Sequence, residues 1–252
     1  MESWTPLSTE GETRAIVIGA RRGLGRALAD HILRLNPLNR VLATSRDPAW
    51  ASAAVDPRET RACLDVTNEA DFEALAARVP AWSTPNCILY AAGVLHDGPV
   101  QPERRWTHLS QGNMGHIFSV NTFGVGLTLR YLVEGLPRRE PGVFGAISAR
   151  VGSIGDNRLG GWYSYRASKA ALNMLIKTAS LEAARSHPQL ICVALHPGTV
   201  TTNLSAPFTK RADPAKLFSP EYSASRLVAV IQGLSPAESG QCFAWDGQVI
   251  PW

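Results

Sequence analysis

The feature that most restricts the fold of this chain is a regular alternation of two patterns. Short apolar runs rich in β-branched residues, such as residues 15–18, 87–90 and 190–195, alternate with longer stretches whose apolar positions recur at helical spacing. Strands that are apolar on both faces and separated by helices are typical of a parallel sheet covered on both sides. We therefore predict one doubly wound α/β domain with a mostly parallel sheet of about seven strands.

The same two patterns give the expected limits of the elements. Strands are predicted at 15–18, 40–45, 61–64, 87–90, 143–148, 190–195 and 241–245. Helices are predicted at 23–35, 69–79, 113–136 (as two stretches), 163–186 and 220–234. The segment 95–110 is polar and contains proline, so we expect a surface loop, and the segment 199–217 shows no clear period and is expected to be irregular.

Length and charge limit the classes of protein to which the chain can belong. With 252 residues, 45% of them hydrophobic, the chain can bury one sizeable core, and no linker-like run divides it. We expect a polar N-terminal extension, residues 1–13, followed by a single domain, residues 14–252. The net charge of +4 is modest and the basic residues are spread out, so no nucleic-acid surface is predicted. Without a signal-peptide pattern or an apolar run of about 18 residues, we expect a cytoplasmic protein with no membrane partner.

A glycine-rich turn follows the first predicted strand and opens the first predicted helix. Residues 19–25 read G-A-R-R-G-L-G. A strand, a turn and a helix in this order direct free backbone N–H groups and the positive helix end at a ligand phosphate. Glycines allow the tight turn and a close approach of the backbone to a pyrophosphate. The turn predicts dinucleotide binding on a Rossmann-type fold.

Tyr165 and Lys169 are candidates for the chemical step. They lie four residues apart on a predicted helix, so their side chains share one face. A free tyrosine has a pKa near 10, which is too high for efficient base chemistry at neutral pH. A nearby ammonium is expected to lower that pKa toward the range in which the group can transfer a proton. Tyr165 would then transfer a proton, with Lys169 as its partner.

The G-x-x-x-G-x-G turn together with Y-R-A-S-K at 165–169 resembles the short-chain dehydrogenase/reductase family, in its single-domain branch. The resemblance extends over nearly the whole chain, and residues 152–163 and 245–252 are similar to the carbonyl-reductase and C-factor-like group of that family. The family fold implies a set of cofactor-binding residues besides Tyr165 and Lys169. These are Gly19, Arg21, Arg22, Gly23, Leu24, Gly25, Ser45, Arg46, Asp65, Val66, Ala91, Ala92, Gly93, Pro197, Gly198, Val200 and Thr201.

The resemblance also implies roles for an asparagine and a serine. Asn121 matches the family's asparagine that interrupts a helix and holds a water linked to the lysine. The family places a substrate-binding hydroxyl in the turn after the fifth strand, where this chain has Ala149 instead. Ser148, one residue earlier, and Ser153, just past the turn, are alternative donors, and a site without a serine donor is the third alternative. Adjacent strand residues point to opposite faces, so Ser148 would face away unless the turn shifts the register.

The end of the second predicted strand bears on the choice of cofactor. An acidic residue there would bind the adenosine ribose and repel a 2′-phosphate, but this chain reads A-T-S-R at 43–46. Arg46 and Arg22 are placed to pair with a 2′-phosphate through charge-assisted bonds. We therefore expect NADP(H) as the cofactor and no metal.

The substrate side is less defined by the sequence. The long segment 199–217 is interpreted as a lid over the substrate. Trp162, Leu204 and Phe208 either line an apolar pocket or belong to ordinary packing, and His96 either borders the site or lies in solvent. By resemblance, Thr199 and Thr201 reach the carboxamide side of the nicotinamide.

Two functions remain open at this point. The first is an enzyme that interconverts a small-molecule carbonyl and an alcohol by hydride transfer with NADPH. The second is an NADP-binding regulatory or signalling protein of low turnover, which the alanine at position 149 keeps under consideration. Family members associate through helix faces, so we expect a homodimer or homotetramer, with the terminal I-P-W at 250–252 against a neighbouring subunit.

Overall fold

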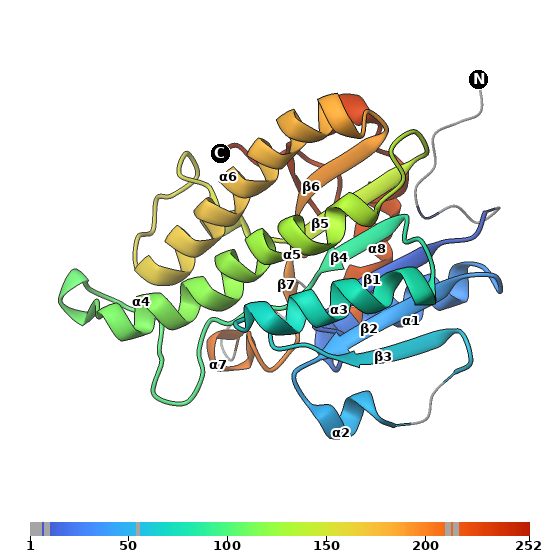
Figure 1. Cartoon of the computed structure of the whole chain (residues 1–252). Coiled ribbons are helices and arrows are strands. Elements are labelled where there is room, and N and C mark those ends of the chain that lie inside the picture. The colour runs from blue at the N-terminus through green and yellow to red at the C-terminus, as the bar shows by residue number, and fades with distance from the viewer. Residues whose placement is uncertain (1–6, 8–10, 54–55, 210–212, 214–216) are drawn as a thin grey trace.

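The computed structural model describes all residues except 1–6, 8–10, 54–55, 210–212 and 214–216 (Figure 1). Within the described residues, seven parallel strands form the central sheet in the order β3-β2-β1-β4-β5-β6-β9. Their bounds are β1 (Arg14–Ile18), β2 (Arg40–Ser45), β3 (Glu59–Cys63), β4 (Cys87–Tyr90), β5 (Gly142–Ile147), β6 (Leu190–His196) and β9 (Cys242–Ala244). The predicted doubly wound, seven-stranded sheet is confirmed.

Helices cover both faces of this sheet. On one face lie α1 (Gly23–Leu35) and α8 (Pro220–Gln232), whose apolar side chains share a cluster with Val17, Leu89 and Val143 of the strands. On the other face lie α3 (Glu69–Trp82), α5 (Gly124–Leu132) and α6 (Tyr163–Ser186), as Figure 1 shows. None of the helices in the described ranges is both long and apolar enough to span a membrane.

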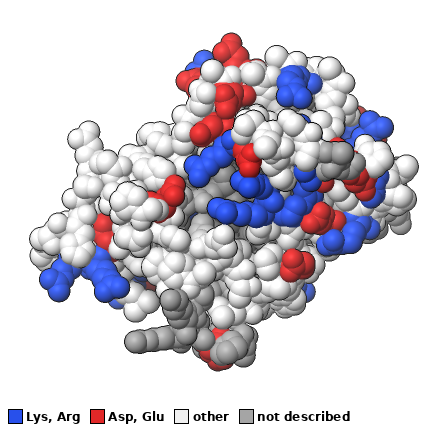
Figure 2. All heavy atoms as spheres, turned by 90° about the horizontal axis from the view of Figure 1, so that it is seen from below, with Lys and Arg blue, Asp and Glu red and all other residues white. Residues whose placement is uncertain are grey.

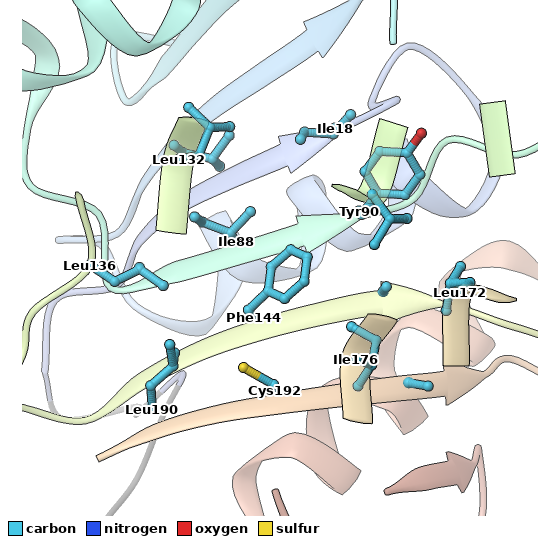
Figure 3. Close-up of a cluster of buried hydrophobic side chains, with 14 of the residues drawn as sticks. Ile18, Ile88, Tyr90, Leu132, Leu136, Phe144, Leu172, Ile176, Leu190 and Cys192 are labelled. Atoms are coloured by element: carbon cyan, nitrogen blue, oxygen red, sulfur yellow. The ribbon is translucent and has the colours of Figure 1, made fainter. Parts of the chain in front are cut away.

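Alternating strand residues build the second of these layers. Ile88 and Phe144 of neighbouring strands lie in one cluster with Leu172 and Ile176 of α6, and all four are fully buried (Figure 3). Adjacent strand residues such as Leu89 and Val143 point to the opposite helix layer. Because both faces are buried, the strands read as continuous apolar runs, which is why the sequence located them well.

The strand order reverses between β1 and β4. Chain segments that leave β1 turn toward β2, and those that leave β4 turn toward β5. In open parallel sheets, ligands bind in the crevice outside the carboxyl ends of the strands at such a reversal. The glycine turn after β1 and the small-residue turn after β4 therefore border one crevice.

The middle of the chain departs from the prediction of two plain helical stretches. The segment consists of α4 (Gln111–Phe118), a π-helical turn η2 (Ser119–Phe123), α5 and a short 3₁₀ turn η3 (Val133–Gly135). A π turn inserts one extra residue into the helix, and such insertions are frequent at functional sites. Further short elements, not predicted, are α2 (Pro48–Ala51), η1 (Trp106–His108), η4 (Arg150–Gly152) and η6 (Pro236–Glu238).

The segment 199–217, predicted to be irregular, contains regular structure among its described residues. Its two ends form a small parallel sheet from β7 (Thr199–Val200) and β8 (Leu217–Phe218), and α7 (Ala206–Thr209) lies between them. Lys210, Arg211 and Pro214, which we had included in the lid, lie outside the described residues, as does most of the expected extension 1–13.

Candidate active site

Two glycines allow the close approach of the first turn, helix α1 and the turn after β4. Gly19 has a positive φ of 84°, and a Cβ there would lie 2.8 Å from the backbone nitrogen of Ala92. A Cβ on Gly25 would lie 2.2 Å from the carbonyl oxygen of Gly19. Any larger residue would therefore separate α1 from the β1 turn or push that turn away from β4.

The N-terminus of α1 has the properties of an anion site. Arg22 is the N-cap residue, but no side chain caps the helix and its first turn holds no acidic residue. The first backbone N–H groups of a helix lack intrahelical acceptors and carry the positive end of the helix dipole. A diphosphate in the crevice would supply those acceptors.

Basic side chains surround this end of the site. Arg22 and Arg46 are exposed, and Arg21 pairs with Asp47 at 2.8 Å. Burial by itself would raise the pKa of Asp65, but hydrogen bonds from Thr67 and the positive charge of Arg46 outweigh it, so the pKa is lowered. Figure 2 shows a group of Lys and Arg side chains in the middle and right of the face seen from below, with Asp and Glu between some of them.

Tyr165 and Lys169 lie in the first turns of α6, and both are buried, with 8% and 3% of their surface exposed. The Lys169 Nζ lies 5.8 Å from the centre of the Tyr165 ring and donates a 2.8 Å hydrogen bond to the carbonyl oxygen of Ile147 at the end of β5. A Cβ on Gly93, after β4, would lie 3.8 Å from that Nζ. The predicted pair thus shares one face of the helix and points toward the carboxyl ends of β4 and β5.

Burial dominates the pKa values of this pair. It raises the pKa of Tyr165 to about 12 and lowers the pKa of Lys169 to about 7. Our expectation that the ammonium lowers the tyrosine pKa is therefore not met in this structure. The physical reason is that removal from water disfavours both charged forms, the phenolate of Tyr165 and the ammonium of Lys169.

Asn121 links three segments around the pair. It lies in the π-helical turn, is fully buried, and exchanges two 2.8 Å hydrogen bonds with the backbone of Val94, one in each direction. Its Nδ2 also donates to the Ser168 hydroxyl at 3.1 Å, next to Lys169. A Cβ on Gly93 would lie 3.6 Å from its Oδ1. The interruption expected from the sequence is thus a π turn that connects the loop after β4 to α6.

The two candidate serines both have other partners. Ser148 is buried, and its hydroxyl donates a 2.6 Å hydrogen bond to Oδ1 of Asn173, one turn beyond Lys169 on α6. The Ser153 hydroxyl accepts a hydrogen bond from the backbone N–H of Asp156 at 3.0 Å. Ala149 lies between β5 and η4 in an extended conformation and has no side-chain donor.

A row of aromatic rings leads from Tyr165 to α7. The Trp162 ring lies edge-on, 6.2 Å from the Tyr165 ring and 5.1 Å from the Phe208 ring of α7. The His96 ring lies 5.7 Å from Phe208, and its Nε2 is 3.1 Å from the carbonyl oxygen of Asn203. Trp162, Phe208 and His96 therefore lie next to one another on one side of Tyr165, and neither His96 nor Trp162 is isolated in solvent or in the core.

The other predicted residues occupy the turns around the same crevice. Thr201 donates to the carbonyl oxygen of Phe218 from both its N–H and its hydroxyl, at 2.9 and 3.1 Å, and Val200 pairs with Phe218. A Cβ on Gly23 would lie 3.3 Å from Thr202, so the segment after β7 reaches the start of α1. The Ser45 hydroxyl accepts from the N–H of Asp47, and Val66 packs against the start of α5.

One buried acidic residue near the site was missed by the sequence analysis. Glu103 lies in the polar segment 95–110, where its charge indicated a solvated loop, yet only 3% of its surface is exposed. Its carboxylate contacts Ser164 at the start of α6. Its position in an aperiodic loop gave no signal of burial.

The doubly wound sheet, the uncapped helix beside it and the buried tyrosine–lysine pair are the combination found in one class of α/β oxidoreductases. A family model described as short chain dehydrogenase matches residues 13–213, and the chain belongs to this family.

Individual relatives agree with this assignment. The chain is 30% identical over 241 residues to the 1-hydroxy-2-glutathionyl-2-methyl-3-butene dehydrogenase of Rhodococcus sp. (strain AD45), covering 94% of this chain and 98% of that one. It is 33% identical over 141 residues to C-signal of Myxococcus xanthus, covering 56% of this chain and 79% of that one.

Two solved structures are similar over almost the whole chain. The NADPH-bound carbonyl reductase from chicken fatty liver has a TM-score of 0.81 and 30% identity, covering 95% of this chain and 98% of that one. A short-chain dehydrogenase/reductase from Burkholderia multivorans with bound NADP has a TM-score of 0.77 and 27% identity, covering 96% of this chain and 100% of that one. The resemblance to the carbonyl-reductase and C-factor-like group is confirmed.

Proposed function

We propose that this oxidoreductase reduces a small-molecule ketone or aldehyde with NADPH, or oxidises the corresponding alcohol in reverse. The observation that carries the proposal is the buried Tyr165–Lys169 pair at the carboxyl ends of β4 and β5, beside the anion site of α1. The similar structures that hold NADPH or NADP support the same cofactor here.

The residues present fit a dinucleotide phosphate. The uncapped N-terminus of α1 offers N–H groups to the pyrophosphate, and Gly19 and Gly25 keep the turn free of side chains there. Arg22 and Arg46 would pair with a 2′-phosphate, since no carboxylate competes before Asp47, and Asp47 already pairs with Arg21. When bound, NADPH supplies the hydride that the carbonyl carbon receives.

Tyr165 supplies the proton in this proposal. With its pKa raised to about 12, the phenol keeps its proton at neutral pH and is ready to donate it. The carbonyl oxygen takes up that proton as the carbon is reduced, because the developing alkoxide is a stronger base than the phenolate. Lys169 then stabilises the phenolate by its charge and, by family resemblance, holds the nicotinamide ribose hydroxyls.

Asn121 and the serines complete the proposed site. Asn121 fixes the loop after β4 next to Lys169. By family resemblance, it would also hold the water through which the proton is replaced. Ser148 would have to release Asn173, and Ser153 would have to release the N–H of Asp156, before either could donate to the substrate oxygen. The site therefore works with one donor fewer than the family pattern in its present arrangement.

The alternative is an NADP-binding regulatory protein of low turnover, favoured by Ala149 and by the engaged serines. The two functions are separated by NADPH consumption against a panel of ketones and aldehydes, with Tyr165→Phe as the control. Turnover in the wild type that Tyr165→Phe abolishes supports the enzyme. Turnover that persists in Tyr165→Phe refutes the mechanism, and tight NADPH binding without any turnover favours regulation.

Cofactor choice has its own test. Arg46→Asp should weaken NADPH binding by a factor of about 10 or more while sparing NADH, because one charge-assisted pair to the phosphate is lost and a repulsive charge replaces it. Equal affinity of the wild type for NADH and NADPH contradicts the assignment.

Association into a homodimer or homotetramer is also part of the proposal. Leu109, Met114 and Phe123 are exposed apolar residues around a shallow hollow of about 440 Å³ on α4 and the π turn. Ile250, which we expected against a neighbouring subunit, is instead buried in the core of its own chain. Sedimentation would give the oligomeric state.

A further inference from the structure

Glu103 forms a clasp between the loop after β4 and the start of α6. Its carboxylate accepts hydrogen bonds from both the backbone N–H of Ser164, at 3.1 Å, and the Ser164 hydroxyl. Its backbone carbonyl accepts a 2.6 Å hydrogen bond from the N–H of Trp162. Glu103 and Ser164 have only 3% and 1% of their surface exposed, so this is an interior contact between segments 61 residues apart.

The clasp replaces the cap that α6 lacks. The N-cap residue is Trp162, which offers no side-chain acceptor and has a left-handed backbone with φ of 52°. For a bulky residue this conformation is strained and persists only when surrounding contacts enforce it. A carboxylate at the positive end of a helix is favourable, and the hydrogen bonds offset the cost of burying its charge.

The residues held by Glu103 are those that flank the reacting group. Ser164 directly precedes Tyr165, and the Trp162 ring packs edge-on against the Tyr165 ring and against Phe208 of the lid. Movement of the first turn of α6 would therefore move the Tyr165 hydroxyl and the Trp162 ring together. No charge of Glu103 acts on the pKa of Tyr165, for which burial is the cause, so its influence is geometric.

We propose that Glu103 is a positioning residue for the reduction: through Ser164 and Trp162 it fixes the place of the Tyr165 hydroxyl and of the ring beside the substrate. This inference rests on the proposed function. A catalytic group that is displaced by about 1 Å can lose about 100-fold in rate, so the effect on turnover should be large.

The test compares Glu103→Ala, Glu103→Gln and Ser164→Ala. Glutamine keeps the length of the side chain and can bond Ser164 with its amide, so it should retain most of the turnover number. Glu103→Ala should lower kcat by about 100-fold and Ser164→Ala by about 10-fold, with NADPH affinity unchanged within about twofold. Hydrogen exchange of residues 162–168 should accelerate in the same order.

Glu238 offers a matched control. Its carboxylate also accepts from the N–H and the hydroxyl of one serine, Ser235, at 2.7 and 2.6 Å. Glu238 lies in η6. The hydroxyl of the next residue, Ser239, accepts a hydrogen bond from the N–H of Cys192 in the amino-terminal half of β6, so Glu238 lies near the end of the sheet opposite to the site. Glu238→Ala should leave kcat unchanged at a temperature where the protein is folded.

The outcomes are distinct. If Glu103→Ala keeps the wild-type kcat while exchange accelerates, or if Glu103→Gln loses as much as Glu103→Ala, the positioning role is wrong. Should Glu103→Ala fail to fold, Ser164→Ala carries the test by the same two readouts. A wild type that binds NADPH and reduces no carbonyl refutes the proposed function itself, and with it this role.

Discussion

Lys169→Met should make the protein more stable at neutral pH while abolishing its turnover. Burial lowers the pKa of Lys169 from 10.5 to about 7, so the folded state disfavours the protonated amine. Since one pKa unit corresponds to about 1.4 kcal/mol, the folded state bears a cost of up to about 5 kcal/mol from this group. Methionine has a similar length and no charge, so it removes that cost.

The sign of the pH dependence follows from the two pKa values. Below about pH 7 the amine is protonated in both states and the full cost is present. Between about pH 7 and 10.5 only the unfolded state is protonated, so stability rises with pH, and above 10.5 the cost is absent. Between pH 7 and pH 9 the wild type should gain about 2 kcal/mol that Lys169→Met does not gain.

The assay is urea unfolding of the cofactor-free protein at pH 7, 8 and 9, for both proteins. The lost hydrogen bond to Ile147 costs about 1 kcal/mol at every pH, so it cancels from the difference in slope. Lys177→Met, eight residues further along α6, is the control and should follow the wild type. Parallel stability curves for wild type and Lys169→Met would refute the reasoning.

Three further predictions concern other residues. Ala149→Ser should raise kcat by about 10-fold or more, because one donor to a reacting oxygen is worth about 100-fold; an unchanged kcat means that no donor is missing there. Gly25→Ala should weaken NADPH binding by at least about 10-fold in a fluorescence titration, because its Cβ would lie 2.2 Å from the Gly19 oxygen; wild-type affinity would contradict this. Burial is the main cause that lowers the pKa of His196 to about 4 in the folded state. Between pH 6.5 and 4 the imidazole is therefore neutral in the folded state and protonated in the unfolded state, so the free energy of unfolding should fall by about 3 kcal/mol as the pH drops through this range. His196→Gln should flatten this loss in unfolding measured at pH 7, 5.5 and 4.5, and an equally steep loss would show that other groups cause it.

The fold was predictable because its strands are buried on both faces. Limits such as 23–35, 87–90 and 163–186 agree with the structure, since an apolar run or a helical period changes abruptly at each end. The helix at 113–136 was less well predicted. The residues of its π turn, S-V-N-T-F, do not differ in type from those of an ordinary helix, so the sequence does not mark the turn. The change of backbone at Asn121 depends on hydrogen bonds to Val94 and Ser168, which are distant in sequence.

The site was predictable where a short motif carries the geometry. Tyr165 and Lys169 lie four residues apart on one helix, so their contact is local. Glu103 could not be predicted, because its burial depends on a loop meeting a helix end 61 residues later. The pKa of Tyr165 was misjudged for a related reason: the sequence gives the neighbouring charge but not the depth of burial that outweighs it.

The small sheet of β7 and β8 joins the two ends of the segment 199–217, which we expected to be a lid. Such a segment is closed on itself at its base, so its interior can grow, shrink or change composition at a cost that rises only slowly with length. Changes in this segment would reach the tyrosine helix through the contact of Phe208 with Trp162, which packs against Tyr165. A change of sequence at Phe208 would therefore alter the aromatic surroundings of Tyr165 without breaking a hydrogen bond between the strands of the main sheet.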